Sequence, residues 1–138
     1  MKLALVVSDT GPAQHAAQRL RAGHDWVSPD AADALVVAGG DGFMLHVLHS
    51  MLDLGRVLPC YGLNLGTVGF LMNRNTSKRA IAERVARARP IAVCPLEMIA
   101  EKQDGSIVRH YAINEVSLLR ETRQTAKLEV IVNGKVRM

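Results

Sequence analysis

The stretch Leu-Val-Val-Ala-Gly-Gly-Asp-Gly, residues 35–42, decides the fold of this chain. Its first half is an unbroken apolar run, typical of a central parallel strand that is buried on both faces. The glycines that follow let the backbone lie close to a bound group, and apolar residues at helical spacing over 43–52 predict a helix. A strand, a glycine turn and a helix N-terminus together form an anion site. The sequence therefore predicts a phosphate site with Asp41 at its lip, unless Asp41 only caps the helix.

The composition is that of a folded protein that binds small molecules. The chain has 138 residues, of which 49% are hydrophobic, so a real core can form. Only 4% are aromatic, and the net charge of +4 suits anionic small molecules, so nucleic acid is not implied. Cys60 and Cys94 each lie in a short apolar run, and we expect buried free thiols. The chain has neither a signal-peptide pattern nor about 18 consecutive apolar residues, which predicts a cytoplasmic protein that does not cross a membrane.

The chain changes character near residue 95. Before it, predicted strands at 3–7, 25–28, 35–38 and 57–61 alternate with predicted helices at 12–22, at 43–52 and from Thr76 or Ser77 to 89. After it, Asp-Gly at 104–105 and Asn-Gly at 133–134 predict hairpins among strands at 98–103, 106–111, 112–120 and 127–132. We expect a doubly wound, Rossmann-like α/β domain at 1–95, followed by the beginning of an antiparallel, β-rich domain at 96–138. Four residues after Gly134 are few for a partner strand, so we expect the second domain to be incomplete.

Two further groups of polar residues are candidates for a site. The segment 62–71, Gly-Leu-Asn-Leu-Gly-Thr-Val-Gly-Phe-Leu, is a second glycine-rich loop after a predicted strand, where ligands bind in open α/β sheets. Asn114 and Glu115 lie within a predicted apolar strand. Burying such a pair without partners costs several kcal/mol, so we expect them to contact ligand hydroxyls or base edges, unless one faces solvent on an edge strand.

The pattern around Asp41 suits phosphoryl transfer. The chain has no P-loop, and its glycines do not have the Gly-x-Gly-x-x-Gly spacing, so neither standard nucleotide motif applies. A carboxylate beside a phosphate-binding turn can act as a general base on a hydroxyl or hold a divalent cation. Asp41 suits either role.

Three motifs, in their order along the chain, resemble the NAD kinase family. They are Gly-Gly-Asp-Gly at 39–42, Leu-Asn-Leu-Gly-Thr-Val-Gly-Phe-Leu at 63–71 and Ala-Ile-Asn-Glu-Val at 112–116. The first is shared with phosphofructokinases and diacylglycerol-type lipid kinases, whereas the combination is specific and covers almost the whole chain. The resemblance implies binding of NAD and ATP, with transfer of the γ-phosphoryl group of ATP to the 2′-hydroxyl of the adenosine ribose of NAD. The product is NADP, and the reaction needs Mg²⁺ or another divalent cation.

The resemblance also implies roles for single residues. Asp41 would be the catalytic carboxylate near the ribose hydroxyl, and Gly40 and Gly42 would line the phosphate site. Phe70 would lie beside the adenine, and Asn114 with Glu115 would contact the nucleoside hydroxyls and base. Similar enzymes are homodimers or homotetramers.

The chain departs from the family pattern in two ways. Many members have Thr or Ser where this chain has Phe43, so a hydroxyl is missing from the helix start. The C-terminal domain of the family normally continues well past position 138, which predicts a C-terminally truncated chain. A lipid or sugar kinase of the same superfamily, and an inactive nucleotide-binding fragment, stay open as alternatives.

Overall fold

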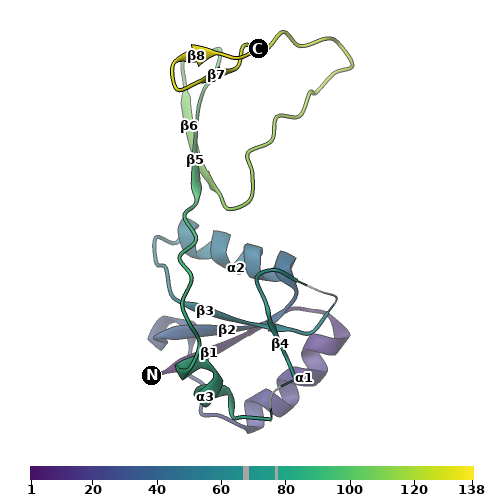
Figure 1. Cartoon of the computed structure of the whole chain (residues 1–138), viewed down its shortest axis with the longest axis vertical. Coiled ribbons are helices and arrows are strands. Elements are labelled where there is room, and N and C mark those ends of the chain that lie inside the picture. The colour runs from purple at the N-terminus through teal and green to yellow at the C-terminus, as the bar shows by residue number, and fades with distance from the viewer. Residues whose placement is uncertain (67–68, 77) are drawn as a thin grey trace.

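The first part of the chain folds around a parallel sheet (Figure 1). The computed structural model describes residues 1–66, 69–76 and 78–138. Four strands pair in the order β1-β2-β3-β4: β1 (Leu3–Val7), β2 (Ala34–Gly39), β3 (Cys60–Asn64) and β4 (Asn73–Arg74). The helical elements are α1 (Gly11–Ala22), the short 3-10 helix η1 (Pro29–Ala31), α2 (Asp41–Asp53) and α3 (Ile81–Ala86). The predicted α/β class of this part is confirmed.

Helices cover both faces of this sheet. In Figure 1, α2 lies on one side, and α1 and α3 lie on the other. Side chains alternate along β2 because successive residues of a strand point to opposite faces. Leu35 and Val37 pack against Met44 of α2, whereas Val36 packs with Ile81 of α3. Every residue of β2 is buried, which explains its unbroken apolar sequence.

The predicted strand at 25–28 is wrong as a strand, but the segment lies beside β1. The Val27 amide donates to the Leu3 carbonyl at 3.0 Å, and the Ala34 amide donates to the Lys2 carbonyl at 3.4 Å. Consecutive carbonyls of a strand point to opposite edges, so Val27 lies on the edge of β1 that faces away from β2. Among the described backbone hydrogen bonds, this is the one that joins residues 25–28 to β1, and the chain then enters η1, so the segment is not a strand.

The third strand and the third helix differ from their predicted bounds. Strand β3 runs to Asn64, so Gly62 belongs to the strand and not to the loop. A Cβ on Gly62 would lie 2.5 Å from the sulfur of Met72 and 2.8 Å from the terminal methyl of Met44, so these two side chains pack closely over the glycine and would have to shift for a larger residue. Helix α3 covers only 81–86 of the predicted span up to residue 89. Its N-cap is Ala80, not Thr76, and Ser77 lies outside the described residues.

Two hairpins form the second part of the chain. Strands β5 (Leu96–Glu101) and β6 (Ile107–Ala112) pair antiparallel, and so do β7 (Ile131–Val132) and β8 (Lys135–Val136). The two turns carry the backbone that their sequences predict, with φ of 79° at Gly105 and of 51° and 74° at Asn133 and Gly134. Both hairpin predictions are confirmed, and the residues after Gly134 do supply a short partner strand.

The predicted strand at 112–120 is wrong, because its partner ends first. Strand β6 stops at Ala112, which pairs with Leu96. The next residue would pair with Pro95, which has no N–H group to donate. Residues 113–130 are therefore irregular, and the predicted strand at 127–132 is reduced to β7.

The two cysteines lie in different surroundings. Cys60, in β3, is half-buried, and burial raises the pKa of its thiol to about 11. Cys94 is exposed, because it lies on the irregular connector between α3 and β5. The expectation of a buried thiol is therefore wrong for Cys94. None of the helices in the described part of the chain is long and apolar enough to span a membrane.

Candidate active site

Three loops meet at one edge of the parallel sheet, where β1, β2 and β3 end. The loop after β1 is tied to β2, because the Ser8 amide donates to the Ala38 carbonyl at 3.0 Å. The loop after β3 is tied to the glycine turn, because the Leu65 amide donates to the Gly39 carbonyl at 2.9 Å. The carboxyl ends of parallel strands are the usual ligand-binding edge of such sheets. The glycine turn and the second glycine-rich loop of the sequence are therefore neighbours.

Asp41 joins the glycine turn to the loop after β3. Its Oδ2 accepts the Phe70 amide at 2.6 Å, and its Oδ1 accepts the Leu71 amide at 3.1 Å. We call this carboxylate with its two amides the Asp41 clasp. Hydrogen bonds to a charged acceptor are stronger than neutral ones, and a negative charge is favoured in the first turn of a helix. Asp41 is the first residue of α2 and the N-cap is Gly40, so the alternative that Asp41 only caps the helix is wrong.

Gly69 is the residue that leaves room for the Asp41 clasp. A Cβ at this position would lie 2.4 Å from Asp41 Oδ1 and 2.9 Å from its Cγ, both far inside normal contact distance. At Gly66, in the same loop, a Cβ would meet nothing within 4 Å. The sequence predicted flexible glycines in this loop, but the structure shows that Gly69 is needed for space. Thr67 and Val68, also in the predicted loop, lie outside the described residues.

The glycine turn before α2 is packed on one side and open on the other. A Cβ on Gly39 would lie 2.9 Å from Cδ1 of Phe43, so the Phe43 ring packs against this turn. Added Cβ atoms at Gly40 and Gly42 would meet nothing within 4 Å. The first amides of a helix have no carbonyl partner within it. The turn therefore offers free space beside backbone donors, as a phosphate oxygen requires.

The other predicted site residues are not brought to Asp41 by their side chains. Phe70 joins the Asp41 clasp through its amide, while the residue as a whole is 99% exposed. Asn114 and Glu115 are exposed in the irregular segment after β6. Within the described ranges, no hydrogen bond or ion pair links either of them to Asp41.

Ser8 lies beside the glycine turn, a position that the sequence analysis did not single out. Ser8 is buried, and its Oγ lies 3.1 Å from Thr10 Oγ1. The same Oγ atom would lie 3.1 Å from a Cβ added to Gly39. The sequence carried a signal for it, since Ser-Asp-Thr at 8–10 directly follows the first predicted strand. A polar loop after a neighbouring parallel strand lies at the same edge as the glycine turn.

The described side chains do not form a metal centre. In the part of the chain that the structure covers, no group of three or more His, Cys, Asp or Glu side chains is arranged to hold a metal ion. Both oxygens of Asp41 already accept amides. The arrangement thus supplies a positioned carboxylate, backbone donors and open space at a helix start.

Comparisons with known proteins identify relatives of this chain. The family model described as ATP-NAD kinase N-terminal domain matches residues 5–88. The chain is 53% identical over 135 residues to an NAD kinase of Rhizorhabdus wittichii, a match that covers 98% of this chain and 52% of the relative. It is also 45% identical to an NAD kinase of Zymomonas mobilis and 46% identical to one of Rhizobium meliloti, each covered to 52%.

The chain spans about half the length of the curated relatives that it matches. No solved structure matches it. The match to the family model begins within β1, at residue 5, and ends at residue 88. It therefore includes the glycine turn, the loop after β3 and α3. The chain therefore belongs to the ATP-NAD kinase family.

Proposed function

We propose that this chain carries the catalytic carboxylate of an NAD kinase, which transfers the γ-phosphoryl group of ATP to the 2′-hydroxyl of the adenosine ribose of NAD to give NADP. The observation that carries the proposal is the Asp41 clasp, which holds a carboxylate beside an open glycine turn at a helix start. Family membership and relatives that are named NAD kinase support NAD over a lipid or a sugar as the acceptor.

Asp41 is proposed to accept the proton of the ribose hydroxyl. A carboxylate has about four lone-pair sites, and the two amides of the Asp41 clasp occupy one on each oxygen. The remaining lone pairs can accept a hydrogen bond from a hydroxyl as it attacks phosphorus. In phosphoryl transfer, catalysis comes mainly from positioning and charge stabilisation, so a carboxylate held by two amides suits the reaction.

The glycine turn is proposed to hold phosphate groups. The open space at Gly40 and Gly42 lies at the positive end of the α2 dipole, where anions are stabilised. A divalent cation, Mg²⁺ by preference, would enter bound to the phosphates of ATP, because Mg²⁺ is commonly held by substrate phosphates with few protein ligands.

The remaining assignments concern the nucleoside and the assembly. We propose that the exposed Phe70 ring stacks on adenine, and that Asn114 and Glu115 reach the nucleoside from the irregular segment. We keep the division into domains 1–95 and 96–138, which is supported by the irregular connector over 88–95. A homodimer or homotetramer is proposed from the family, and light scattering after size-exclusion chromatography measures it.

The test uses a chimera of this chain with the C-terminal half of the Rhizorhabdus wittichii relative, whose matching half is 53% identical. NADP formation from NAD and ATP with Mg²⁺ is measured for the chimera and for its Asp41→Asn and Asp53→Asn variants. Asp53 is exposed at the end of α2 and gives the same change in charge. We expect a loss of at least about 100-fold for Asp41→Asn, within the range of general-base catalysis, and little change for Asp53→Asn.

Retention of NADP formation by Asp41→Asn would contradict the assigned role. Turnover of diacylglycerol or a sphingoid base, with none of NAD, would favour the lipid-kinase alternative. No binding of NAD by calorimetry and no turnover of any acceptor would favour a non-catalytic module.

A further inference from the structure

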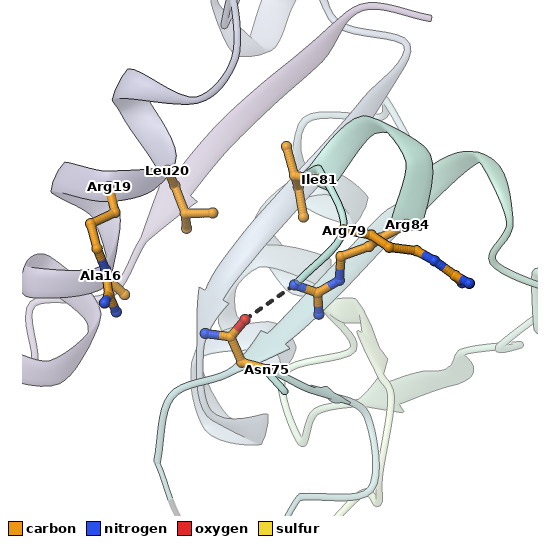
Figure 2. Close-up of a pocket in the computed structure, with 7 residues that line it drawn as sticks. All are labelled: Ala16, Arg19, Leu20, Asn75, Arg79, Ile81 and Arg84. Atoms are coloured by element: carbon orange, nitrogen blue, oxygen red, sulfur yellow. Dashed lines mark hydrogen bonds between the residues drawn. The ribbon is translucent and has the colours of Figure 1, made fainter. Parts of the chain in front are cut away.

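A pocket on the α1 and α3 side of the sheet is separate from the Asp41 clasp. Its volume is about 300 Å³, and three arginines, Arg19, Arg79 and Arg84, line it together with Asn75 and apolar side chains (Figure 2). We call it the arginine pocket. None of its lining residues belongs to the Asp41 clasp or to the glycine turn. A volume of this size is at the lower end for ligand sites, so it suits a small ligand.

Arg84 is fixed in place by neutral groups. Its Nη1 donates to Asn75 Oδ1 and its Nη2 donates to the Arg74 carbonyl, each at 3.1 Å. Its guanidinium carbon lies 5.8 Å from the centroid of the Tyr61 ring, within cation–π range. These contacts order the side chain before any ligand arrives, which lowers the entropy lost on binding. In the described part of the chain, no carboxylate forms an ion pair with Arg84, so its positive charge is not compensated.

A second positive charge faces Arg84 across the arginine pocket. Figure 2 shows Arg19 on α1, on the opposite side of the pocket from Arg84. Arg19 forms no ion pair with any described carboxylate. Arg79 differs, because its Nε lies 3.5 Å from Glu83 Oε1 and its charge is already compensated. Among the described residues, two guanidinium groups without an ion pair therefore face this space, those of Arg19 and Arg84.

Among the described side chains that line the arginine pocket, the polar ones offer donors and no free acceptor. Arg19 and Arg84 can only donate, and the oxygen of Asn75 is already used by Arg84. In Figure 2 the amide nitrogen of Asn75 is turned to the side of α1, so its N–H groups are directed to the space near Arg19. The apolar side chains of Ala16, Leu20 and Ile81 also line the pocket, and electrostatic attraction is stronger beside apolar surface than in bulk water.

From this arrangement we propose that the arginine pocket binds a small phosphate-bearing molecule. A phosphate group carries close to two negative charges at neutral pH and only acceptor oxygens, which matches two guanidinium groups and one amide. A carboxylate supplies one charge and leaves one guanidinium uncompensated. This site does not depend on the NAD kinase assignment, since it shares no residue with the proposed catalytic carboxylate.

Inorganic phosphate is the probe, and NMR separates this pocket from the glycine turn. Phosphate is titrated into the ¹⁵N-labelled protein at low ionic strength, and the side-chain signals of Asn75 and Arg84 Nε are followed. We expect these signals to move along a saturable curve, and acetate at equal concentration to leave them nearly unchanged.

Three variants test the geometry. We expect Arg19→Gln to weaken phosphate binding at the Asn75 and Arg84 signals about tenfold, as the loss of one charge-assisted hydrogen bond. The matched control is Arg21→Gln, which changes the same charge in the last turn of α1 outside the pocket, and we expect less than about a twofold effect. Asn75→Asp keeps an acceptor for Arg84 but places a negative charge in the pocket, so it should abolish binding while the folded spectrum remains.

Three results would each overturn the proposal. They are signal shifts that do not saturate, equal weakening by Arg19→Gln and Arg21→Gln, and binding to Asn75→Asp at wild-type strength. An acetate response equal to that of phosphate would refute the preference for phosphate.

Discussion

The substitution Gly69→Ala tests whether the loop after β3 exists to hold Asp41. The added Cβ would lie 2.4 Å from Asp41 Oδ1, about 1 Å inside normal contact, so the loop or the carboxylate must move. Such a movement breaks the hydrogen bonds of 2.6 and 3.1 Å that form the Asp41 clasp. The change therefore opens the clasp without touching the carboxylate itself.

The size of the effect follows from the two hydrogen bonds. Each bond to a charged group contributes about 1.5–3 kcal/mol, and the lower value applies here because Asp41 is half-exposed. The loss of both hydrogen bonds lowers the free energy of unfolding by about 3 kcal/mol. Alanine also reduces the conformational entropy of the unfolded chain, which raises the free energy of unfolding by about 0.4–1 kcal/mol. We expect a net loss of about 2 kcal/mol. In the chimera with the relative's C-terminal half, displacing the carboxylate by about 1 Å should lower NADP formation about 100-fold.

The assay is urea unfolding followed by the fluorescence of Trp26, the single tryptophan, which is half-buried beside β1. Gly66→Ala is the matched control in the same loop, where a Cβ meets nothing within 4 Å, and it should be as stable as the parent or slightly more so. Hydrogen exchange gives a local readout, because the amides of Phe70 and Leu71 should lose protection only in Gly69→Ala. Equal stability of the two variants, with both amides still protected, would refute the reasoning.

Two further predictions concern parts of the fold outside the site. Arg56 donates to the carbonyls of residues 29, 30 and 32 at 2.9 to 3.3 Å. Arg56→Ala should therefore lower the free energy of unfolding by about 1–2 kcal/mol, measured by thermal unfolding. The control is Arg89→Ala at an exposed position, which should leave the free energy of unfolding unchanged. Burial raises the pKa of the Cys60 thiol from 9.0 to about 11. At pH 8 the thiolate fraction of Cys60 should therefore be about 100-fold below that of an unperturbed thiol, and its rate of reaction with a thiol reagent should be lower by the same factor. Both should rise with pH until about 11. Equal rates for Cys60 in the folded and the urea-unfolded protein at pH 8 would contradict this.

Local patterns predicted most of the elements correctly. The apolar runs of β1 and β2, the alanine face of α1 and the two hairpin turns each depend on residues that are close in sequence. Ala13, Ala16 and Ala17 are buried, as their helical spacing predicts. Turn chemistry at 104–105 and 133–134 needs only the residues of the turn themselves, so both hairpins were predictable.

The errors arose where a distant residue decides the local structure. Asn114 and Glu115 lie in a sequence with strand character, but the partner strand cannot continue past Pro95. Gly62 lies inside β3, where Met44 and Met72 pack closely over it, and this packing is not visible in the local sequence. Arg84 lies on α3, and its contacts with Asn75 and the carbonyl of Arg74 come from a segment outside that helix, so helical spacing alone does not predict them.

The sequence by itself determined that a carboxylate follows a glycine turn at the start of a helix, because strand, turn and helix there depend on consecutive residues. Only the tertiary structure decided what that carboxylate binds. Its amide partners lie 29 and 30 residues farther along the chain, and they reach it because the loops after β2 and β3 meet at one edge of a parallel sheet. The need for glycine at position 69 follows from the same approach, since a side chain conflicts only with a group that packing brings close.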